Sequence, residues 1–118
     1  MDAAATERIG SPSLGDVVRQ GDLYLVCVES LPDGRPWKGR QLAPGTTQGS
    51  RHVAEGECRI VDGNDTDAPR ELLGPSFECL GDVEVSHPEH GNKILPEGTC
   101  WSVVHQRTWA DEVRRVQD

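Results

Sequence analysis

Short apolar stretches, each bounded by turn-forming residues, recur along this 118-residue chain. Leu23–Val28 is the clearest, because six consecutive residues carry no charge, which favours a strand covered on both faces. In residues 99–108, Trp101, Val103 and His105 alternate with their neighbours, as expected for a strand with two different faces. Further strands are expected over residues 40–43, 52–55, 57–61, 77–80 and 83–86.

The frequency of glycine and proline, 13 and 8 residues, favours many turns and short strands over long helices. The length suits one domain with its own core. We therefore expect a mainly β fold, a compact antiparallel sandwich or small barrel with a short C-terminal helix or tail. Residues 1–14 are expected to be a flexible N-terminal lead-in, and residues 15–118 a single β-rich domain.

A formal net charge of -8 argues against binding to nucleic acid or to an anionic membrane surface, because phosphates attract clustered lysine and arginine. No stretch approaches the roughly 18 consecutive apolar residues of a membrane span. Residues 1–13 also lack the basic start and apolar run of a secretory signal. We therefore expect a cytoplasmic protein with no contact to a membrane.

The four cysteines, Cys27, Cys58, Cys79 and Cys100, include no C-x-x-C pair that would indicate a zinc ribbon. In a reducing compartment they are expected to be free thiols that pack as small hydrophobic residues. Cys100 and His105 could suggest a nucleophile with its base. However, they differ by an odd number of positions and would face opposite sides of one strand.

The segment His87-Pro88-Glu89-His90 places two imidazoles and a carboxylate within four residues. If the strand around His52 packs against this segment, His52, His87 and His90 would offer three ligands to a divalent transition metal, assisted by Glu89 or Glu55. Such a metal would stabilise the fold or activate water. Alternatively, the histidines hydrogen-bond to backbone groups of a turn and Glu89 is solvated. We expect no cofactor, with this metal as the alternative.

Residues 62–67 resemble the start of a calcium-binding loop, with Asp62, Asn64 and Thr66 at alternate positions. Asp67 and Leu73 stand where such a loop requires glycine and glutamate, so we expect a solvated loop.

One local cluster of basic residues, Arg35, Lys38 and Arg40, surrounds Trp37. Basic residues beside an aromatic ring can hold single-stranded nucleic acid, but tryptophan and arginine also anchor protein interfaces. The acidity of the whole chain argues against nucleic acid, which leaves a solvated loop or a protein interface. The candidate interface residues are Trp37, Trp109, Arg114 and Arg115.

Several motifs occur in a distinctive order: Gln20-Gly21-Asp22 before a strand, His52 before Gly56-Glu57, His87-Pro88-Glu89-His90, Leu95-Pro96-x-Gly98, and Gln106-Arg107 before Trp109. Over about residues 20–118, this order resembles a family of small, functionally uncharacterised bacterial proteins. Its pattern is a QGD-led strand, Gly-His-x-His, HPEH and LPxGxYxVxxQREY. Here Ser50 replaces the first of these histidines, and Cys100 replaces an aromatic residue. The resemblance implies a fold and a site that lacks one candidate ligand, but no reaction.

The sequence contains no phosphate-binding loop, no complete nucleophile arrangement and no full set of metal ligands. We therefore expect no catalytic residues and a non-catalytic protein-binding or assembly domain. It would be an accessory or structural subunit of a larger bacterial complex, and its partner would be another protein or itself. The alternative is a metal-binding domain with hydrolytic activity that uses His52, His87 and His90.

Overall fold

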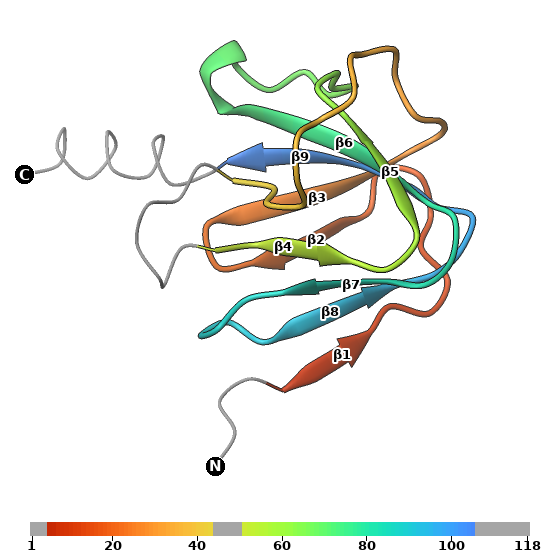
Figure 1. Cartoon of the computed structure of the whole chain (residues 1–118), viewed down its shortest axis with the longest axis vertical. Coiled ribbons are helices and arrows are strands. Elements are labelled where there is room, and N and C mark those ends of the chain that lie inside the picture. Colours follow the sequence, from red (N-terminus) through yellow and green to blue (C-terminus); the bar gives the residue numbers. More distant parts are fainter. Residues whose placement is uncertain (1–4, 44–50, 106–118) are drawn as a thin grey trace, which may run out of the picture.

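The computed structural model describes residues 5–43 and 51–105, which fold into two packed β-sheets (Figure 1). A 3-10 turn, Arg70–Leu72, precedes the sixth strand. The strands in these residues are β1 (Thr6–Arg8), β2 (Val17–Gln20), β3 (Leu23–Val28), β4 (Val53–Glu55), β5 (Cys58–Val61), β6 (Leu73–Cys79), β7 (Val83–Ser86), β8 (Asn92–Leu95) and β9 (Cys100–His105).

One sheet has the order β1-β8-β7-β4 and the other β2-β3-β9-β6-β5. Neighbouring strands are antiparallel except β1 and β8, which are parallel. Within the described residues no ladder joins the two sheets, so the predicted mainly β fold is confirmed as a sandwich rather than a closed barrel. The expected lead-in over residues 1–14 includes β1. The C-terminal helix or tail lies outside the described residues.

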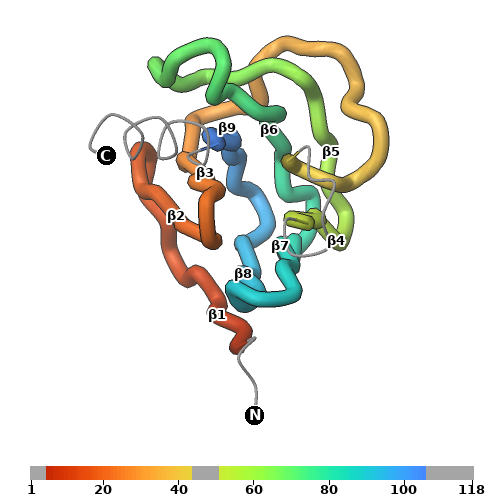
Figure 2. The backbone as a smooth tube through the Cα atoms, turned by 90° about the vertical axis from the view of Figure 1, so that its left-hand side faces the viewer, coloured from red at the N-terminus to blue at the C-terminus, as the bar shows by residue number. Residues whose placement is uncertain are grey.

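The core lies between the two sheets. Figure 2 shows the backbone of both sheets from the side. Along β3, Leu23, Leu25 and Cys27 are buried, while the residues between them are half-buried. The strand predicted at residues 23–28 is therefore present, but its two faces differ in burial. Trp101 and Phe77, both fully buried, are the largest core side chains and come from the adjacent strands β9 and β6.

The segment 35–42 covers two edge strands at once. Pro36 forms a bridge to Val61 of β5, and Gln41 forms one to Val53 of β4. An uncovered edge strand presents unpaired backbone groups to other chains, so this cover protects both sheets on one side of the sandwich. It also explains why residues 40–43, predicted as a strand, form a single bridge instead.

The acidic loop 62–67 exposes its three aspartates, as expected of a solvated loop, while its other residues pack against the outer face of the sheet. Asn64 Nδ2 donates hydrogen bonds to Gly74 O at 3.0 Å and Val103 O at 2.8 Å, where the register between β6 and β9 shifts. Ser76 Oγ donates to Gly63 O at 2.7 Å. Because this loop covers β6 and β9, Ser102 is fully buried although it points away from the core.

Replacing Asn64 with alanine should lower the free energy of unfolding by about 1–3 kcal/mol, because the carbonyls of Gly74 and Val103 lose their donor. Urea unfolding measures the change. Asp67→Ala, an exposed position in the same loop, is the matched control and should change stability by less than about 0.5 kcal/mol. Equal losses in the two variants would contradict the assigned role of the Asn64 amide.

Candidate functional site

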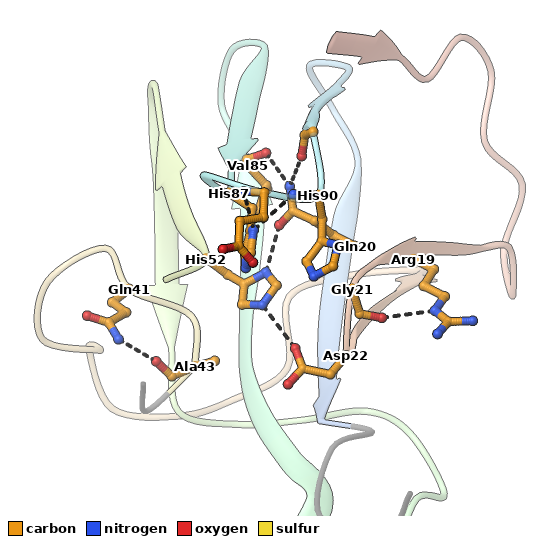
Figure 3. Close-up of polar contacts among 12 residues, drawn as sticks. Arg19, Gln20, Gly21, Asp22, Gln41, Ala43, His52, Val85, His87 and His90 are labelled. Carbon is orange, nitrogen blue, oxygen red and sulfur yellow. Dashed lines mark hydrogen bonds and ion pairs between the residues drawn. The ribbon is translucent and has the colours of Figure 1, made fainter. Parts of the chain in front are cut away.

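The structure brings His52, His87 and His90 together at one end of the sandwich (Figure 3). The ring centroids of His52 and His87 are 4.4 Å apart, and those of His87 and His90 are 4.5 Å apart. His52 and His87 are buried, whereas His90 is exposed. His52 therefore lies against the bend at residues 87–90, as expected. The three rings follow one another and are tilted relative to each other.

The centre of the site is the buried side chain of Gln20, the last residue of β2. Its Nε2 donates to Val85 O at 2.9 Å and to Gly91 O at 2.6 Å. Val85 lies in β7 of the opposite sheet, and Gly91 lies in the turn between β7 and β8. Its Oε1 lies 2.8 Å from His52 Nδ1. Since two carbonyls can be satisfied only by the amide nitrogen, the orientation of the Gln20 amide is determined.

This orientation determines the tautomer of neutral His52. Gln20 Oε1 accepts a hydrogen bond, so Nδ1 of His52 must carry the proton and Nε2 carries the lone pair. Nε2 lies 3.2 Å from Asp22 Oδ1. No water molecule fits between two atoms this close, so the contact is a hydrogen bond when Nε2 of His52 carries a proton and brings two acceptors together when it does not. The Asp22 side chain is 37% exposed, so solvent reaches its carboxylate.

Burial, and after it the charge interaction with neighbouring His87, lower the pKa of His52 from 6.5 to about 4. Asp22 raises the pKa of His52, but its effect is smaller than the lowering that results from burial of the ring. His52 is therefore neutral at pH 7, and its contact with Asp22 is a contact of a neutral ring with a carboxyl group.

The backbone of the bend determines the role of His87. Its Nδ1 accepts hydrogen bonds from the backbone N–H groups of Glu89 at 3.0 Å and His90 at 3.1 Å. In a neutral ring the proton must then be on Nε2, which leaves no lone pair for a metal on either nitrogen. His87 thus acts as the turn-capping residue of the alternative interpretation.

Within residues 5–43 and 51–105, no group of three histidine, cysteine, aspartate or glutamate side chains is arranged to hold a metal ion. Of the two carboxylates considered as assisting ligands, Glu89 is exposed and contacts His87 through its backbone N–H. Glu55, at the end of β4, is exposed as well. The rings of the proposed trio gather, but they stack instead of converging on one point.

Gly21 explains how the rings approach β2 so closely. Its φ is +61°, a conformation that favours glycine, and a Cβ at this position would lie 2.4 Å from the Cδ2 atom of His90. The His90 ring therefore lies directly against the backbone of the Gln20-Gly21-Asp22 turn.

The four thiols are free, as predicted, and three of them have raised pKa values. Burial raises the pKa of Cys79 to about 12, and it also raises the pKa values of Cys27 and Cys100. A protonated thiol is a poor nucleophile. The structure therefore adds no support for Cys100 as a nucleophile with His105 as its base.

The candidate interface residues are only partly within the described chain. Trp37 is half-buried, and its Nε1 donates to Gln41 O at 2.9 Å. Arg40 of the basic cluster turns back to donate to Gly56 O at 2.8 Å. Trp109, Arg114 and Arg115 lie outside the described residues.

Two residues of the site, Gln20 and Asp22, were not predicted as site residues, although both belong to a motif that the sequence analysis identified. A signal for Gln20 exists: it follows buried Val18 by two positions, so in a strand it shares the inward face. A polar residue in such a position must find hydrogen-bond partners in the interior.

Because the pKa of His52 is lower in the folded than in the unfolded chain, its contribution to stability is present above pH 6.5 and is lost as pH falls toward about 4. The shift from 6.5 to about 4 corresponds to roughly 3 kcal/mol of unfolding free energy. Urea unfolding at several pH values measures it.

The His52→Gln protein, which keeps a donor for Gln20, should lack this part of the pH dependence. Burial also lowers the pKa of His105, so the difference between the two proteins isolates His52. His90→Gln, at an exposed ring, is the control and should keep the wild-type dependence. Parallel pH profiles for wild type and His52→Gln would contradict the assignment.

A family model for a domain of unknown function, DUF8820, matches residues 19–106. This match includes Gln20, Asp22 and the three clustered histidines, together with most of both sheets. Neither a curated protein nor a solved structure matches the chain. None of the described residues forms a helix long and apolar enough to cross a membrane. The chain therefore belongs to the family of proteins that carry the domain of unknown function DUF8820.

Proposed function

We propose that this chain is a non-catalytic assembly domain that contacts another protein chain, with a second copy of itself as the partner, through the edge of strand β2. The observation that supports the proposal most strongly is the exposure of apolar residues in β2 and in the turn that precedes it. Leu14 is 63% exposed and Val17 is 54% exposed. They are two of the three large hydrophobic side chains that are exposed within the described residues, the third being Leu80.

The other edges of the sandwich are protected in ways that discourage pairing. β4 and β5 are covered by the segment 35–42. β1 has three exposed residues, two of them charged: Glu7 pairs with Lys93 at 2.7 Å and Arg8 with Asp82 at 2.9 Å. Cover and charge are both common protections against edge-to-edge pairing. Among the described residues, no strand or bridge pairs with the outer edge of β2.

The face beside this edge is suited to burial against another chain. Val17 lies opposite half-buried Val26 of β3, and Arg19 lies opposite Tyr24, whose ring centroid is 5.7 Å from the guanidinium carbon. Valine, tyrosine and arginine side chains thus adjoin an unprotected strand edge. Tyrosine and arginine are enriched at protein interfaces.

A non-catalytic role agrees with the state of the chemical groups. The histidines of the site are engaged in hydrogen bonds or packed against backbone, and three of the thiols have raised pKa values. Within the described residues these groups maintain the fold, which leaves the surface as the place where a function would be carried out.

Light scattering after size-exclusion chromatography should show a mass that rises toward a dimer with protein concentration. Val17→Lys and Leu14→Lys should each weaken self-association by roughly tenfold, because a charge at the edge opposes burial of its backbone. Leu80→Lys, at an apolar position outside β2, is the matched control. A monomer at every concentration, or an equal effect of Leu80→Lys, would contradict assembly through β2.

A further inference from the structure

An open groove of about 600 Å³ lies beside Trp37 and is independent of the β2 edge. Trp37, Lys38, Asp62, Glu71, Leu73 and His105 are among the residues that line it. The groove has the size of ligand-binding pockets, which range over roughly 300–1,000 Å³.

The indole of Trp37 is held in place before any ligand arrives. Its backbone N–H donates to Ile60 O at 2.8 Å, and its ring Nε1 donates to Gln41 O at 2.9 Å. A ring fixed in this way loses little conformational freedom when a ligand packs against it. Tryptophan also attracts cations to its face more strongly than the other aromatic side chains.

The charges along the groove favour a cation. Glu71 and Asp62 are exposed carboxylates that line the groove. Of the basic cluster around Trp37, Lys38 alone is among the described lining residues, and Arg40 donates to Gly56 O instead. Burial lowers the pKa of His105, so this ring adds no positive charge at pH 7. The whole chain has a net charge of -8, which adds a long-range attraction for basic partners.

We propose that this groove binds an arginine or lysine side chain of a basic segment in a partner protein, with the cation between Trp37 and Glu71 and an adjoining apolar residue against Leu73. The partner is a protein rather than a nucleic acid, because phosphates would be repelled by the same carboxylates. This binding goes beyond the assembly through β2 and does not depend on it.

The test is an NMR titration of the ¹⁵N-labelled full chain with three capped tetrapeptides, in which leucine alternates with arginine, glutamine or glutamate. The arginine peptide should shift the Trp37 indole N–H signal and the backbone signals of Leu73 and Gly74, and the shifts should weaken with added salt. Glu71→Gln should weaken its binding by about threefold, as expected for one partly screened ion pair, and Lys38→Gln should strengthen it by a similar factor.

Glu97→Gln, an exposed carboxylate that does not line the groove, is the matched control and should leave binding unchanged. Val17→Lys should leave it unchanged as well, which separates this proposal from assembly through β2. Equal binding of the glutamate peptide, no shift with the arginine peptide at millimolar concentration, or no effect of Glu71→Gln would each overturn the proposal.

Discussion

The buried amide of Gln20 is the interaction on which the site depends. A primary amide in the interior must satisfy two N–H donors and a carbonyl, since each unsatisfied group costs about 1–3 kcal/mol. Gln20 meets this requirement by reaching from β2 in one sheet to Val85 and Gly91 of the other, and to His52. The same contacts join the two sheets and determine the orientation of the His52 ring. The His87 ring lies against His52, and the His90 ring lies against His87.

Strand β2 therefore has two different roles on its two faces. Val18 and Gln20 are buried and anchor the strand to the interior, while Val17 and Arg19 are exposed. An edge strand held this firmly is preorganised for pairing, because it need not be ordered when a partner arrives. The groove at Trp37 is fixed in a comparable way, through hydrogen bonds of the segment that covers β4 and β5. Both proposed surfaces are thus built on elements whose backbone is already ordered.

Much of the fold could be predicted from hydrophobic pattern alone. The strands at residues 23–28 and 83–86 were predicted with their observed bounds, because each alternates buried residues with less buried ones and ends at turn-forming residues. β1, β2 and β8 were missed since they are short and contain charged or polar residues. β8 pairs with its neighbour β7, but the pairing of β1 with β8 is parallel and distant in sequence, and local pattern has no information about such a contact.

The sequence indicated which histidines could meet, but it had no information about the hydrogen bonds that these rings make. Two histidines close in sequence indicated a site, and the structure does place His52 beside them. Whether histidines bind metal or stabilise a turn depends on which ring nitrogen carries a proton, and this depends on partners remote in sequence, such as Gln20. The importance of Gln20 became visible only when the opposite sheet supplied two carbonyls for its amide.

The most direct test of the Gln20–His52 connection is a long-range ¹H–¹⁵N spectrum of the imidazole rings at pH 7. Bonded to Gln20 Oε1, the His52 ring should be neutral, with its proton on Nδ1 and a bare Nε2. A ring protonated on Nε2 alone, or on both nitrogens, at pH 7 would contradict the account.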